Sequence, residues 1–134
     1  MTKLLLHCTV ILVLSIGCTH SLIPKKGPFY SIEVRLDEAY QSNVQDVAVM
    51  FGNPPRAENR LRVGALNIGS AKTDHFFRRR IPNEFILSWR VEKGDYVVER
   101  TIPILQRCGP EFIGTMVFTI RRGDSVDLHF ESEP

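Results

Sequence analysis

The amino-acid sequence predicts an all-β fold, a small antiparallel β-sandwich of about seven strands over residues 29–134. Apolar and polar residues alternate with a period of two along most of this region, which is the pattern of strands with one buried face. Glycine, proline, asparagine and aspartate separate these segments at short intervals, as turns would. A helical pattern is present only in residues 37–44, where it is weak.

The first expected strands follow one another from Phe29 onward. In residues 30–37 every even-numbered residue is apolar and every odd-numbered residue is polar, so one face would pack on the core. Residues 44–51 repeat the pattern, and residues 52–59, with a glycine and two prolines, are expected to interrupt it. Residues 61–69 predict a third strand that Gly64 weakens, and residues 75–80 are a candidate fourth strand.

Two hairpins are expected in the second half of the chain. Residues 85–91 place Trp89 on an apolar face, and residues 93–95 turn the chain into a strand over 96–104. The last hairpin has one register that brings six apolar side chains to the same face, pairing Ile120 with Val126, Phe118 with Leu128 and Met116 with Phe130. This register leaves Arg122, Gly123 and Asp124 as the loop.

The position of Trp89 resembles that of the core tryptophan in immunoglobulin-like sandwiches. The cysteine pair that joins the two sheets in antibody domains is missing, so the resemblance concerns the architecture alone.

The N-terminus predicts export. Residues 1–17 combine an early lysine, an apolar run of about 14 residues and a small residue at the end, which is the layout of a signal peptide. The run is shorter than the ~20 residues that span a bilayer as a helix, which disfavours the alternative of an uncleaved membrane anchor.

Gly17 followed by Cys18 resembles the signal of bacterial lipoproteins, in which the cysteine thiol carries a diacylglycerol and the chain is cut before it. Ser15 departs from the pattern, because a leucine is more usual three residues before the cysteine. The resemblance implies a lipid anchor on Cys18. Because Thr19 and not aspartate follows Cys18, the resemblance also implies that the anchor lies in the outer membrane. Ordinary cleavage near Cys18 and a Cys18–Cys108 disulfide is the alternative. A lipidated Cys18 would leave Cys108 as a buried apolar residue or a site for intermolecular pairing.

Residues 18–28 read as the lipidated cysteine and a flexible tether, because two prolines, a glycine and a lysine pair prevent packing. The tether reaches at most about 30 Å at ~3.1 Å per residue. Removing residues 1–17 takes away one basic and no acidic residue, so the net charge falls from +2 to +1. A nearly neutral chain has no electrostatic bias toward nucleic acid.

No pattern in the sequence predicts an enzyme or a cofactor. The serines lack a nucleophile-elbow context, and the histidines have no paired spacing. Asp127, His129 and Glu131 share the outer face of the last strand, where they either line a metal site or satisfy the polar half of the alternation.

Two basic motifs are candidate binding sites. Arg78, Arg79 and Arg80, with His75 before them, form the densest positive stretch, which either contacts a partner or protects an edge strand from pairing. Arg122-Gly123-Asp124 is the integrin-adhesion tripeptide, but Gly-Asp is also common in tight turns. We therefore expect a non-catalytic envelope lipoprotein whose sandwich binds a protein or glycan partner at the membrane surface, with contacts at His75–Arg80.

Overall fold

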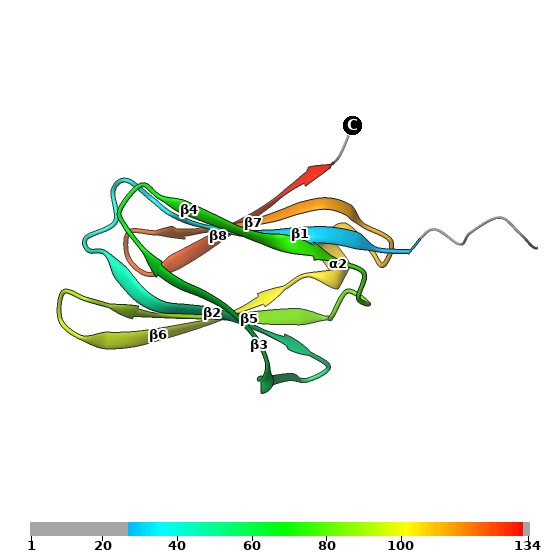
Figure 1. Cartoon of the computed structure of the whole chain (residues 1–134), viewed down its shortest axis with the longest axis horizontal. Coiled ribbons are helices and arrows are strands. Elements are labelled where there is room, and N and C mark those ends of the chain that lie inside the picture. Colours follow the sequence, from blue (N-terminus) through cyan, green and yellow to red (C-terminus); the bar gives the residue numbers. More distant parts are fainter. Residues whose placement is uncertain (1–26, 133–134) are drawn as a thin grey trace, which may run out of the picture.

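The computed structural model describes residues 27–132, with the side chains of His75 and Phe76 left out. Two four-stranded sheets pack face to face and form a β-sandwich, which confirms the predicted fold class (Figure 1). One sheet has the strand order β4-β1-β7-β8 and the other has the order β3-β2-β5-β6.

The described chain contains eight strands and one short helix. In order they are β1 (Phe29–Leu36), β2 (Val44–Gly52), β3 (Pro55–Leu66), β4 (Ala71–Phe77), β5 (Glu84–Val91), β6 (Tyr96–Pro103), α2 (Leu105–Cys108), β7 (Ile113–Arg121) and β8 (Ser125–Ser132).

Five of the six strand pairings are antiparallel, as the sequence predicts, and the sixth, between β1 and β7, is parallel. Parallel strands need a long crossover between them, and here the whole second sheet and α2 lie between β1 and β7 in the chain. Side-chain alternation has the same period in both kinds of pairing, so it does not reveal strand direction.

Three segments differ from the sequence-based expectations. β3 begins at Pro55, inside the stretch expected to interrupt the sheet, because an edge strand accepts proline as its first residue. β4 runs from Ala71 to Phe77 and ends before the arginines. Residues 37–43 form turns, and the one helix of the described chain, α2, is instead a single turn beyond β6.

The core lies between the two sheets and follows the predicted alternation. The even-numbered residues of β1, from Tyr30 to Leu36, are all buried, and Trp89 on β5 is 1% exposed. The predicted register of the last hairpin is confirmed, with Met116 opposite Phe130 and Ile120 opposite Val126. None of the helices within residues 27–132 is long and apolar enough to cross a membrane.

Candidate binding surfaces

The three consecutive arginines lie in the loop between β4 and β5. The guanidinium carbon of Arg78 is 5.2 Å from the centre of the Phe29 ring, and that of Arg79 is 5.1 Å from the centre of the Phe51 ring. Such contacts hold a cation over the face of an aromatic ring without neutralising its charge. Within the described chain, none of Arg78, Arg79 and Arg80 forms an ion pair with an acidic residue.

The basic loop lies at the end of the sandwich where β1 begins. Phe29 is the first residue of β1, and Figure 1 shows the start of β1, the end of β4 and helix α2 at this same end. We call it the tether end, since residues 18–28 precede Phe29 in the chain. The opposite end, with the turns at residues 37–43, 92–95 and 122–124, is the far end.

Arg79 also covers part of the core at the tether end. It lines a small apolar hollow together with Tyr30, Ile32, Phe51, Phe77 and Phe85. Burial raises the pKa of the Tyr30 hydroxyl to about 12, although the charge of Arg79 acts in the opposite direction. Both Arg79 and Arg80 are exposed, but Arg79 packs on an aromatic ring, whereas Arg80 has no ring contact or ion pair within the described residues.

His75 lies within β4, an edge strand whose one partner among the described strands is β1. The predicted contact region therefore has two parts, an edge strand that contains His75 and a basic loop that follows it.

Arg122, Gly123 and Asp124 form the turn between β7 and β8, as the register predicts. The Asp124 carboxylate accepts hydrogen bonds from the Tyr40 hydroxyl at 2.5 Å and from the Tyr96 hydroxyl at 3.3 Å. Asp124 therefore has a role inside the fold. Adhesion through this loop stays a prediction, and it would require the carboxylate to leave these partners.

A chain of hydrogen bonds connects this turn to the core. The indole Nε1–H of Trp89 donates to the Tyr40 hydroxyl at 3.0 Å, and that hydroxyl donates to Asp124. Burial, followed by the bond to Asp124, raises the pKa of Tyr40. Sequence reasoning found Trp89 and Asp124 but not their connection, because 84 positions separate Tyr40 from Asp124 and no local pattern relates them.

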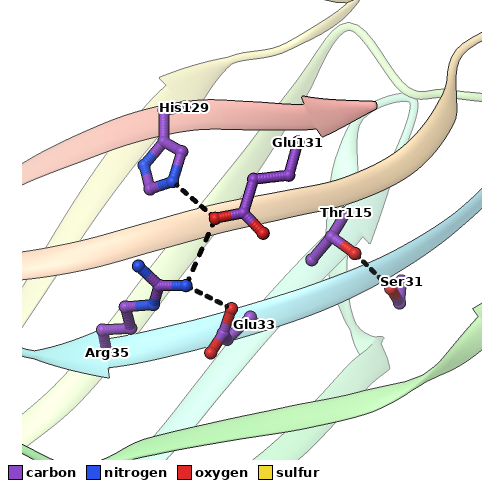
Figure 2. A network of polar contacts seen from close by, with 6 residues as sticks. All are labelled: Ser31, Glu33, Arg35, Thr115, His129 and Glu131. Atoms are coloured by element: carbon purple, nitrogen blue, oxygen red, sulfur yellow. Dashed lines mark hydrogen bonds and ion pairs between the residues drawn. The ribbon is translucent and has the colours of Figure 1, made fainter. Parts of the chain in front are cut away.

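The outer face of β8 carries the three residues considered as metal ligands. His129 and Glu131 share a hydrogen bond of 3.1 Å, and Arg35 reaches Glu131 at 3.3 Å, as Figure 2 shows. The bond from His129 and the charge of Arg35 lower the pKa of Glu131. Asp127 pairs with Arg121 instead. No group of three or more His, Cys, Asp or Glu residues in the described chain could hold a metal ion.

The same face continues onto β1 and β7 with polar contacts between strands. Arg35 also bonds Glu33 at 2.9 Å, and the hydroxyls of Ser31 and Thr115 share a bond of 2.9 Å across the parallel pairing (Figure 2). These side chains satisfy one another on the outer face of the sheet, where Ser31 is buried.

Cys108 ends helix α2 at the tether end and is partly buried against the core. Burial raises the pKa of its thiol, which keeps the thiol protonated and unreactive near neutral pH. Cys18 lies outside the described residues, so the structure tests neither its lipidation nor its disulfide with Cys108.

No protein family, curated protein or solved structure matches this chain.

Proposed function

We propose that this chain is a non-catalytic lipoprotein of the cell envelope, anchored through lipid on Cys18, whose sandwich binds a protein or glycan at the membrane surface. The lipoprotein-like signal up to Cys18 supports the anchor and an outer-membrane location. The sandwich supports binding, since folds of this class present loops and sheet edges on a rigid core.

The observation that carries the proposal is the positive charge of Arg78, Arg79 and Arg80 at the tether end, which no ion pair within residues 27–132 neutralises. Arg78 packs on Phe29, the residue that follows the tether, so the basic loop sits where the chain enters the domain. A tether of at most about 30 Å would keep this loop near the membrane surface. A partner that contacts it would therefore be another component of that surface.

The chemistry of the loop indicates an acidic partner. Guanidinium groups make paired hydrogen bonds to carboxylate and phosphate oxygens, and such charge-assisted bonds are stronger than neutral ones. The rings of Phe29 and Phe51 restrain Arg78 and Arg79 before binding, which lowers the entropy lost on association.

A charge-removal experiment tests this proposal. The triple variant Arg78→Gln, Arg79→Gln, Arg80→Gln should lose crosslinking to the envelope partner, because the acidic contact has no cation left. The single variant Arg122→Gln removes an exposed cation at the far end and should keep crosslinking. Capture by the triple variant at the level of the unmodified chain would show that the partner does not bind through these arginines.

A second candidate is a secreted, unlipidated binding domain with a Cys18–Cys108 disulfide. The location of Cys108 supports it. Cys108 ends α2, four residues before Phe112, and the Phe112 carbonyl accepts a hydrogen bond at 3.0 Å from the backbone N–H of Phe29, the first residue after the tether. Electrophoresis with and without reductant, followed by peptide mapping, separates the two candidates, since only this one predicts a peptide that joins Cys18 to Cys108.

A further inference from the structure

The outer face of the β3-β2-β5-β6 sheet is hollowed by an irregularity in β2. Val44 pairs with Leu66 and Val47 pairs with Gly64, so β2 has one residue more than β3 between these pairs, and a second shift restores the register where Ala48 pairs with Arg62. The extra residue also breaks the pairing with β5, and Asp46 within it has a φ of 51°. This is a β-bulge, which bends a strand and re-aims its side chains.

Small side chains form the floor of the hollow. Ala48 lies opposite Arg62 on one side and opposite Ser88 on the other, and Ser88 lies opposite Glu99. Gly64 contributes no side chain and has a φ of 89°. The result is a trough of about 430 Å³ that crosses all four strands of the sheet. This volume is within the range of small-ligand sites.

Longer side chains form the walls of the trough, and the charges differ from one end to the other. Arg60 and Arg62 stand on β3, and Glu99 stands on β6. Within the described chain neither arginine forms an ion pair or a side-chain hydrogen bond. Arg90, by contrast, is paired with two carboxylates: its Nε lies 3.7 Å from Oδ2 of Asp46, and its Nη1 lies 4.0 Å from Oδ1 of Asp95.

We propose that this trough binds an acidic saccharide through its carboxylate and hydroxyl groups. Arg60 and Arg62 would hold the carboxylate, because two guanidinium groups on alternate residues of one strand offer parallel donors on the same face. The Ser88 hydroxyl and the carboxylate of Glu99, which lies opposite Ser88 on β6, would bond sugar hydroxyls. Ala48 and the 62% exposed Val97 supply apolar contact for the ring carbons.

The distribution of groups favours a short sugar over an acidic peptide. The lining cations that form no ion pair within the described chain, Arg60 and Arg62, are confined to β3, and Glu99 on the opposite wall would repel a second carboxylate. The trough also lacks an exposed aromatic or large aliphatic pocket that would anchor a peptide side chain. The site lies on a sheet face, separate from Arg78–Arg80, and the inference does not depend on the lipid anchor.

An NMR titration tests the proposal. The chain from residue 18 onward, carrying Cys18→Ser and labelled with nitrogen-15, is titrated with glucuronic acid. We expect saturable shifts at Ala48, Arg62 and Ser88 with a Kd on the order of 1 mM. Glucose, which lacks the carboxylate, and glutarate, which lacks the hydroxyls, should each bind about tenfold more weakly or worse.

Matched variants locate the site. Arg62→Gln should weaken glucuronic acid binding about tenfold, because it removes a charge-assisted pair. Arg56→Gln changes another arginine of β3 that pairs with Glu58 outside the trough, and it should leave the Kd unchanged. Equal binding of glutarate, equal binding of glucose, unchanged affinity in Arg62→Gln with an unchanged melting temperature, or no shifts at all would each overturn the proposal.

Discussion

At the far end of the sandwich, a buried tryptophan, a tyrosine and an aspartate are joined by hydrogen bonds that cross from one sheet to the other. At the tether end, arginines lie over phenylalanine rings, and their charge meets no carboxylate of the described chain. The turn at Asp124 is also joined to β6, where Arg100 donates a hydrogen bond to the Asp124 carbonyl at 2.9 Å.

The two ends of the sandwich use their polar side chains differently. Groups that satisfy one another stabilise the fold and have little left for a partner. Charges that rest on aromatic rings keep their hydrogen-bond donors available for a ligand. The comparison therefore predicts large stability effects at the far end and small ones at the tether end, with the binding effects reversed.

The largest stability effect is expected for Trp89→Ala. Trp89 is 1% exposed, and removal of its ring leaves a cavity between the sheets and takes away the donor that the Tyr40 hydroxyl accepts from. The free energy of unfolding should fall by about 3–5 kcal/mol, measured by urea denaturation. A loss below about 1 kcal/mol would show that the ring does not pack in the core.

The next largest effect on stability is expected at high pH and comes from Tyr30, a buried residue at the tether end. The folded pKa of Tyr30, about 12, exceeds its ordinary value of 10.0, so the unfolded state loses its proton first as the pH rises. The stabilisation is complete below pH 10 and is lost between pH 10 and 12, at about 1.4 kcal/mol per pH unit for one proton.

The Tyr30→Phe variant has no hydroxyl to ionise, so its stability should fall less steeply over the same interval. Denaturation at pH 8, 10 and 11 measures both slopes. Identical slopes in the two proteins would contradict the burial of the Tyr30 hydroxyl as the cause.

Tyr40→Phe tests the hydrogen-bond chain at the far end. The change keeps the ring but leaves the Trp89 N–H without its acceptor and Asp124 without its closest donor. We expect a loss of about 1–3 kcal/mol in unfolding free energy. Tyr96→Phe removes a longer, exposed bond to Asp124 and serves as the matched control, with a loss below about 1 kcal/mol.

The smallest effects are expected at the tether end. Arg79→Ala should cost about 0.5–1 kcal/mol, because the guanidinium leaves the Phe51 ring and the apolar hollow. Arg80→Ala should change stability by less than about 0.5 kcal/mol, since Arg80 is exposed. The melting temperatures of the two variants measure this difference. A larger loss of stability in Arg80→Ala than in Arg79→Ala would contradict our assignment of a packing role to Arg79 and none to Arg80.

Much of the sandwich could be predicted from the sequence because alternation and turn residues report the same local geometry. The last hairpin is the clearest case, since a slip by one residue would have moved Phe118 and Leu128 out of the core. The start of β3 was missed because Pro55 usually marks a break, and only its position at a sheet edge makes it acceptable.

The candidate sites depend on contacts that no local pattern contains. The position of Arg78 over Phe29 requires the β1–β4 pairing, and the bond from Tyr40 to Asp124 requires the packing of distant turns. The trough depends on a bulge at Asp46, which the alternation of β2 does not reveal. Sequence reasoning therefore identified individual charged residues and missed how the fold brings them together.

The proposed anchor on Cys18 is the central claim, because it would make the tether end the face nearest the membrane. Mass spectrometry of the N-terminal peptide from protein extracted with detergent tests it most directly. The account predicts that the mature chain begins at Cys18 and carries a thioether-linked diacylglycerol, with or without a further acyl group on its amine. An unmodified Cys18, a Cys18 joined to Cys108, or a chain that begins at another residue would contradict it.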